Sequence, residues 1–403
     1  MVFFCFFLMN HYFAPNALEA HIQDISNELV QEKKEFDEAV QLFKDAKTYT
    51  TEDRGGSVQN YHYYIYPFKG IALSNFRLLQ TLSSHLGKMV APETEVILTV
   101  ETDGISVAAF VAASLGLPLV ICKPFHYHMP SIPLPQKTGY YERTMYMPKV
   151  VEGKKVAIVD CMMSTGGTVR GMIEGLDQLS QTTLTGIYCI NNKDNYRVKT
   201  DNFDGFPYRY VFDTRIEESG TVNCSLSKHG KQTLWESIDE RVYAATENIA
   251  SFSNVSKNGY QVGAIILDSD TLEIKAWGSR RGDLHAEQDA IAMLKQNCPD
   301  WSSRRFTLYS TLEPCTWRKN EGHTACSELI AEIPQIRWVV IGQKDTADEH
   351  INGAGIQHLT KHGKRVRLIR NVEKTLSDVS HHKSFFGDQY KTKKKLGPLI
   401  FLL

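Results

Sequence analysis

The sequence predicts two α/β domains in succession, and three observations carry that prediction. Short apolar runs alternate with helical segments between residues 95 and 191. Strands that alternate with crossover helices form a parallel sheet covered on both faces. A polar, turn-rich stretch over residues 192–233 ends this pattern, and a second alternating series begins near residue 262. At 403 residues the chain is long enough for two separate cores.

The first series is preceded by a helical region. Residues 17–46 carry apolar side chains at helical spacing, which predicts one or two helices, and a second helix is expected over 73–86. Residues 48–60 read as a loop because they are polar and contain Gly55-Gly56. The series itself is expected to contain strands at 95–100, 119–122, 155–160 and 184–191, and helices at 105–115 and 168–179; one further strand, at 208–212, is expected in the turn-rich stretch that follows.

The second series begins with an apparent hairpin over residues 262–277, after a helix at 235–250. Further helices are expected at 286–295, 325–332 and 355–362, and further strands at 306–310, 337–341 and 366–369. These patterns predict an N-terminal helical extension (1–60), a parallel-sheet domain (61–228), a three-layer α/β/α domain (234–378) and a basic and apolar tail (379–403).

Composition narrows the class of protein. The 45 basic and 46 acidic residues nearly cancel, which disfavours a nucleic-acid partner. Eight scattered cysteines favour a reducing compartment, and we predict a cytoplasmic or alternatively a nuclear protein. The apolar segments 2–9 and 399–403 are too short to span a bilayer, so no membrane role is expected.

The residue types of a metal site occur at His285-Ala286-Glu287, Pro314-Cys315 and Cys326. One imidazole and two thiolates can hold Zn²⁺ and leave a fourth position open for water. His285 and Cys326 fall at the starts of predicted helices and Cys315 in the loop after a strand; the partial positive charge of helix N-termini favours the thiolate forms of both cysteines. Glu287 would stand beside the activated water as the catalytic group that moves protons. The alternatives are a structural zinc, with His323 or Cys298 as fourth ligand, and buried cysteines without a metal.

These residues resemble the cytidine deaminase-like superfamily, whose signature is H-x-E followed by P-C-x-x-C. The phrase Thr311-Leu312-Glu313-Pro314-Cys315 is most similar to the pyrimidine deaminase of riboflavin biosynthesis, as is Asn352-Gly353-Ala354-Gly355 before a helix and a last parallel strand. The resemblance implies hydrolytic deamination of a cyclic amidine, and a homo-oligomer. The chain departs from the signature because ten residues, 316–325, lie between the cysteines, and because Gln288-Asp289 follow the glutamate.

A second candidate site follows the strand at 155–160. Its residues Ser164, Thr165, Gly166, Gly167 and Thr168 form a hydroxyl- and glycine-rich turn that opens a helix. Such a turn aims N–H groups and hydroxyls at a phosphate, and the helix dipole adds to the attraction. The alternative is a purely structural turn.

The phrase from Val156 to Thr168 resembles the phosphoribosyl-diphosphate motif of type I phosphoribosyltransferases, and the resemblance covers roughly residues 60–215. It implies that Asp160 holds the ribose hydroxyls, that residues 164–168 cradle the 5-phosphate, and that Mg²⁺ accompanies phosphoribosyl diphosphate. Residues 101–104, which include Asp103, are similar to the diphosphate loop of the adenine-type enzymes, and Lys123 to a basic residue after the next strand. Residues 125–149 stand where the family has its mobile lid.

Two departures bear on activity. Cys161 replaces the second acidic residue of the motif, and Asp103 stands where the adenine-type enzymes have arginine. An acidic side chain that faces a diphosphate weakens binding unless a metal bridges the two.

The leading hypothesis is a zinc-dependent deaminase of a pyrimidine-like base or nucleotide, fused to a domain that binds or transfers a phosphoribosyl group, in nucleotide or riboflavin-type metabolism. Its partner would be a small nucleobase or nucleotide. The alternative is a regulatory or defence effector, in which a degenerate transferase domain senses a nucleotide and the deaminase acts on nucleotides or nucleic acid. A binding module without activity is disfavoured, because all four residues of the zinc site are present.

Overall fold

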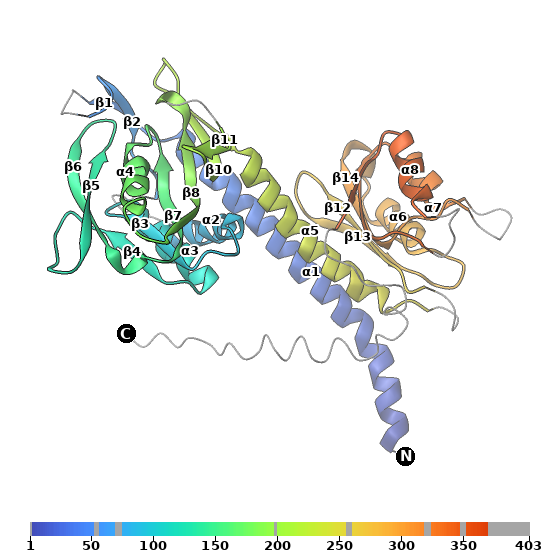
Figure 1. Ribbon diagram of the computed structural model, residues 1–403. Coiled ribbons are helices and arrows are strands. Elements are labelled where there is room, and N and C mark those ends of the chain that lie inside the picture. Colours follow the sequence, from blue (N-terminus) through green and yellow to red (C-terminus); the bar gives the residue numbers. More distant parts are fainter. Residues whose placement is uncertain are drawn as a thin grey trace. The chain divides into compact units, whose positions relative to one another are not determined.

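The computed structural model describes residues 2–369 except 52–55, 69–74, 197–199, 255–259, 318–323 and 347–351, and the side chains from residue 17 onward. The described residues cluster into two compact units (Figure 1). One runs from Gln31 to Ser237, and the other combines the residues before 31 with those from 238 onward. The domain bounds given above remain a prediction.

The unit of residues 31–237 is built on a seven-stranded sheet of order β11-β10-β8-β7-β3-β4, with β9 paired to β10. Strands β4, β3, β7 and β8 are parallel, as predicted; β10 extends the parallel series and β11 adds an antiparallel edge. The elements are the end of α1 (Val2–Lys44), β1 (Thr48–Thr51), β2 (Tyr61–Tyr64), α2 (Phe76–Met89), β3 (Val96–Val100), α3 (Gly104–Leu115), β4 (Leu119–Cys122), β5 (Ser131–Lys137), β6 (Glu142–Pro148), β7 (Lys155–Met163), α4 (Gly167–Leu176), β8 (Thr183–Lys193), β9 (Asn202–Phe203), β10 (Phe206–Ile216), β11 (Val222–Leu226) and the start of α5 (Lys228–Ala250).

Both faces of this sheet are covered. Side chains such as Leu98 and Ile158 join a buried cluster with Met172 of α4 and Leu134 of β5. Because successive side chains of a strand point to opposite faces, the neighbouring Ala157 points the other way, where α2 and α3 contact β8, β7 and β3. Strands β3 and β7 are parallel neighbours. Their carboxyl ends therefore lie next to each other, and they carry the loops of the candidate phosphoribosyl site.

The sequence expectations for residues 48–60 and 192–233 are wrong in part, and the segment expected as a lid contains strands that were not predicted. Part of the expected loop at 48–60 is strand β1, which pairs with β2. The expected lid at 125–149 contains an antiparallel hairpin, β5–β6. The turn-rich stretch 192–233 holds β11 and β9 as well as a longer β10. Strands β1 and β9 are short and β11 lies at the sheet edge. A strand with one exposed face carries polar residues on that face, which weakens the apolar pattern that predicts strands.

At Gly171, the backbone of helix α4 lies very close to the hairpin β5–β6. A Cβ atom added there would come within 2.2 Å of the backbone oxygen of Pro135 on β5. We expect Gly171→Ala to lower the free energy of unfolding by about 1–3 kcal/mol, although alanine is the better helix former. Urea denaturation measures the change, and Glu174→Ala on the exposed face of α4 is the matched control. Equal or higher stability of Gly171→Ala would contradict this packing.

The second unit contains a five-stranded sheet of order β13-β12-β14-β15-β16. Strands β14, β15 and β16 are parallel, as predicted, and β12 is antiparallel to β13 and β14. These five strands and the three helices between them are, in chain order, β12 (Gly263–Asp268), β13 (Ile274–Ser279), α6 (Ala286–Asn297), β14 (Phe306–Leu312), α7 (Cys326–Ala331), β15 (Ile336–Gln343), α8 (Ala354–Lys361) and β16 (Arg365–Leu368).

Helices on both faces of this sheet make the unit a three-layer α/β/α fold (Figure 1). Apolar residues of α6, α7 and α8 pack with one face in a single cluster that includes Ile291, Ile330 and Leu359. Helix α5 covers the other face, where the buried Tyr309 hydroxyl donates to Asp239 at 2.8 Å. The first helix lies beside α5, with His21 within 3.3 Å of Asn248. The fold class predicted from the sequence is confirmed for both domains.

Candidate functional site

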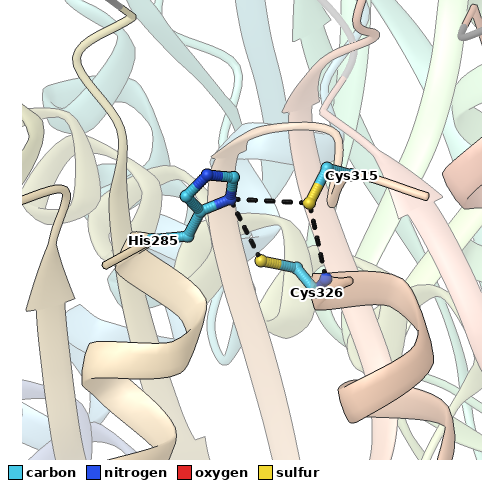
Figure 2. A group of neighbouring side chains, drawn as sticks. All are labelled: His285, Cys315 and Cys326. Carbon is cyan, nitrogen blue, oxygen red and sulfur yellow. Dashed lines mark hydrogen bonds between the residues drawn. The ribbon is translucent and has the colours of Figure 1, made fainter. Parts of the chain in front are cut away.

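The three predicted metal ligands converge in the second unit. The ligand atoms of His285, Cys315 and Cys326 all lie within 4.8 Å of one another (Figure 2). The Nδ1 atom of His285 is 3.5 Å from Sγ of Cys315 and 3.3 Å from Sγ of Cys326. Among the residues that the structure describes, this is the one group of three that could hold a metal ion.

Local structure explains how each ligand is placed. His285 is the N-cap of α6, Cys326 is the first residue of α7, and Cys315 follows strand β14. The backbone N–H of Cys326 points at Sγ of Cys315, 3.4 Å away. The backbone N–H and hydroxyl of Ser327 both donate to the carbonyl oxygen of Cys315, at 3.1 and 3.0 Å. The start of α7 therefore fixes the loop that carries Cys315.

The electrostatics suit a metal site. Hydrogen bonding from Cys326, together with His285, lowers the pKa of the Cys315 thiol to about 4. Glu287 is buried next to the ligands with 3% of its surface exposed, and this burial raises the pKa of its carboxyl group. The hydroxyl of Ser310, a buried residue of β14, donates to Glu287 at 3.2 Å. Hydrogen bonding with Cys315, together with burial, raises the pKa of the Cys326 thiol well above its usual value. Cys315 is therefore the ligand that favours the thiolate form, and it lies beside a sheltered carboxyl group.

The alternative ligands are placed differently. Cys298 is the C-cap of α6, at the far end of a 12-residue helix from His285, and such a helix is about 18 Å long. Its thiol donates to Asp300 at 3.3 Å. Cys298 therefore lies outside the ligand group, and His323 lies outside the described residues.

Gln288 and Asp289, the departures from the family pattern, hold the segments around the metal ligands in place through hydrogen bonds and an ion pair. The backbone N–H of His285 donates to the side-chain oxygen of Gln288 at 3.3 Å, and the Gln288 amide donates to the carbonyl of Thr324 at 3.2 Å. Asp289 accepts from the backbone of Ser279 and pairs with Arg281 at 3.3 Å. Sequence reasoning missed these roles, although a glutamine three residues after a helix N-cap is the pattern of a capping box.

All phosphoribosyl candidate residues except Lys123 line a cavity of about 460 Å³ in the first unit. Asp103, Asp160 and the loop of residues 164–168 all line it. Lys123 does not line it; instead its ammonium group pairs at 3.3 Å with Glu101, which does.

The loop geometry requires its glycines. Gly166 has a φ of 82°, a conformation that side chains disfavour, and it caps the N-terminus of α4. A Cβ atom on Gly167 would come within 1.9 Å of the carbonyl oxygen of Lys137 on the hairpin. The glycines thus let the hairpin approach the loop and leave the first turn of α4 facing the cavity.

Asp160 is poised between protonation states. It is 8% exposed, and burial, together with the nearby charge of Asp103, raises the pKa of its carboxyl group to about 7. The backbone N–H of Cys161 donates to it at 2.7 Å.

Two residues that sequence reasoning missed reach this cavity or its wall. The hydroxyl of Tyr61 on β2 donates to Ser164 of the loop at 2.9 Å. The ammonium group of Lys193 lies 4.2 Å from the centre of the Tyr61 ring, and burial lowers the pKa of this lysine to about 7. Tyr61 lies in a segment that no motif covers, so nothing in the sequence indicated it. Arg143, expected in the lid, lines the cavity and donates to the Glu101 carbonyl at 2.7 Å.

Comparison with known families gives a match in each domain. Residues 77–203 match the family model of the phosphoribosyl transferase domain, and residues 236–343 match that of the cytidine and deoxycytidylate deaminase zinc-binding region. Through residues 77–203 the chain belongs to the phosphoribosyltransferase family, and the match of residues 236–343 supports a fusion of this domain to a zinc-type deaminase domain.

Curated relatives with a transferase name cover little more than a third of the chain. The hypoxanthine/guanine phosphoribosyltransferase of Methanococcus maripaludis is 32% identical over 152 residues, which are 35% of this chain and 82% of that protein. The enzyme of the same name from Methanococcus voltae is 27% identical over 164 residues, 40% of this chain and 87% of that protein.

Solved structures are similar to each half. One is the Thermotoga maritima diaminohydroxyphosphoribosylaminopyrimidine deaminase/5-amino-6-(5-phosphoribosylamino)uracil reductase, at 29% identity and a TM-score of 0.29, covering 34% of this chain and 37% of that one. Another is adenine phosphoribosyltransferase from Thermoanaerobacter pseudethanolicus, at 18% identity and a TM-score of 0.33, covering 44% and 98%. Among the described residues, no helix combines the length and apolar character that a membrane crossing requires.

Proposed function

We propose that the second domain hydrolytically deaminates a pyrimidine-like base or nucleotide, and that the first binds the phosphoribosyl group of phosphoribosyl diphosphate or a nucleotide. The observation that carries the proposal is the convergence of His285, Cys315 and Cys326 beside the buried Glu287. The pairing of domains favours a role in nucleotide or riboflavin-type metabolism.

The donor set fits zinc, because one imidazole and two thiolates are ligands that zinc takes in catalytic sites. Zinc held there would lower the pKa of a water molecule and so supply the nucleophile at neutral pH. Glu287 would take one proton from that water and pass it to the ring nitrogen, while the water oxygen adds to the ring carbon that carries the amino group. The same carboxyl group would then take the second proton from the hydroxyl group formed on that carbon and give it to the amino group, which leaves as ammonia. Water and an amidine thus become a carbonyl and ammonia.

A panel of substrates tests the deaminase. We expect the zinc-loaded full chain to release ammonia from at least one class among free pyrimidines, nucleosides, nucleotides and phosphoribosylated pyrimidines. Zinc content is measured on the same sample. Stoichiometric zinc without deamination of any compound would indicate a structural metal and overturn the proposed reaction.

In the first domain, residues 164–168 would hold the 5-phosphate and Asp160 the ribose hydroxyls. Asp103 and Asp160 both line the cavity, and carboxylates are the ligands through which proteins hold Mg²⁺ beside phosphates. A bridging Mg²⁺ would offset the repulsion between these carboxylates and a diphosphate. A homo-oligomer and a cytoplasmic location remain predictions from the sequence.

Thr165→Ala tests the phosphate loop. We expect the variant to bind phosphoribosyl diphosphate about tenfold more weakly or worse, because a hydrogen bond to a charged group contributes about 1.5–3 kcal/mol. Calorimetry with Mg²⁺ present measures the affinity, and Thr182→Ala, outside the cavity lining, is the control. Unchanged binding would contradict the loop assignment. Diphosphate release with added bases then decides whether the parent domain transfers the group or only binds it.

A further inference from the structure

Glu313 stands directly before Pro314-Cys315 and is buried, with 3% of its surface exposed. Both oxygens of its carboxylate are engaged by backbone N–H groups. Oε2 accepts from Asp345 and from Gly353, each at 3.1 Å, and Oε1 accepts from Ile356 at 3.0 Å. One side chain thus joins the metal-ligand loop to both sides of the β15–α8 connection.

The surroundings can stabilise this buried charge. Gly353 is the N-cap of α8 and Ile356 lies in its first turn, where unpaired N–H groups and the helix dipole favour a negative charge. A carboxylate that accepts several N–H bonds at once is held in one orientation. Glu313 is therefore fixed relative to α8.

The backbone is packed as closely as the side chain. A Cβ atom added to Gly355 would come within 2.2 Å of the carbonyl oxygen of Pro314 and 3.1 Å of Oε1 of Glu313. The backbone N–H of Glu313 also donates to Gln343 at the end of β15, at 2.9 Å. Only Pro314, whose ring restricts φ, separates Glu313 from Cys315. A shift of Glu313 would therefore move the thiolate of Cys315.

We propose that Glu313 is a positioning residue of the metal centre: by clamping the Cys315 loop to β15 and the N-terminus of α8, it holds Cys315 at the distance from His285 and Cys326 that metal binding needs. The inference rests on the proposed zinc site. Residues that orient metal ligands through hydrogen bonds affect metal affinity without touching the metal.

Glu313→Gln tests the clamp in the full chain. Glutamine keeps the size of the side chain but replaces one acceptor oxygen by an amide donor that faces N–H groups. We expect zinc affinity, measured by competition with a chelator, to fall about 10- to 100-fold. Amide hydrogen exchange should accelerate at Asp345, Gly353 and Ile356. Glu332→Gln, an exposed residue at the end of α7, is the control and should change neither quantity.

Gly355→Ala is the second variant, since it separates α8 from Pro314 without removing a charge, and it should also weaken zinc binding. A merely structural role would lower the unfolding temperature of these variants while the folded protein kept its zinc affinity. Zinc affinity unchanged in both variants would overturn this inference alone. Failure of the parent chain to bind zinc would overturn the proposed metal site and this inference with it.

Discussion

Glu287→Gln is expected to lower the turnover number for deamination by about 10²- to 10⁴-fold, the range for loss of a general acid–base group, while zinc stays bound. Glutamine has the same shape and can still accept the hydrogen bond that the Ser310 hydroxyl donates to Glu287 at 3.2 Å. It cannot take a proton from water or return one to the leaving ammonia. The folded site is therefore preserved and only the proton transfer is lost.

The measurement combines ammonia release on the best substrate of the panel with zinc analysis of the same sample. Glu328→Gln, an exposed carboxylate on α7, is the matched control and should keep the parent rate. Loss of zinc together with activity would show that Glu287 acts as a ligand. Retained activity would assign the proton transfer to another group.

The sequence indicated the candidate metal ligands because its information there is local. His285 and Cys326 stand at helix N-termini and Cys315 follows a strand, and those positions follow from the alternation of apolar and polar residues. The residues that hold the ligands in place were not predicted. Gln288 reaches Thr324, 36 positions away, and Glu313 reaches Gly353, 40 positions away; no local pattern encodes such pairs.

The first site was predicted less completely. The loop at 164–168 follows from one strand–turn–helix phrase, and the structure places it at the cavity. The other walls come from the hairpin β5–β6 and from Tyr61 on β2. These strands alternate buried and exposed residues. Their side chains become part of the site only through tertiary packing against the sheet, which no local pattern shows. Lys123, predicted from its place after β4, pairs with Glu101 instead of lining the cavity.

Asp160→Asn is expected to stabilise the protein at pH 8 and to have little effect near pH 4. Burial, helped by Asp103, raises the pKa of the Asp160 carboxyl group from about 3.8 to about 7. Between these values the native state holds a proton that the unfolded state has lost. Stability therefore falls as the pH rises from 4 to 7. A tenfold change in the proton affinity of a group corresponds to about 1.4 kcal/mol, so the full cost above pH 7 is on the order of a few kcal/mol.

Asparagine carries no charge at any pH, so the variant lacks this loss and its advantage over the parent should grow from pH 4 to pH 8. Urea denaturation at several pH values measures it, with Asp24→Asn, an exposed carboxylate on α1, as control. The same variant should lose affinity for phosphoribosyl diphosphate at pH 8, because the amide nitrogen cannot accept hydrogen bonds from ribose hydroxyls. A stability gain that accompanies weaker ligand binding is the signature of a group kept for binding at a cost in stability. If the stability of variant and parent changed with pH in the same way, Asp160 would be ionised at every pH tested. That result would contradict the expected gain in stability.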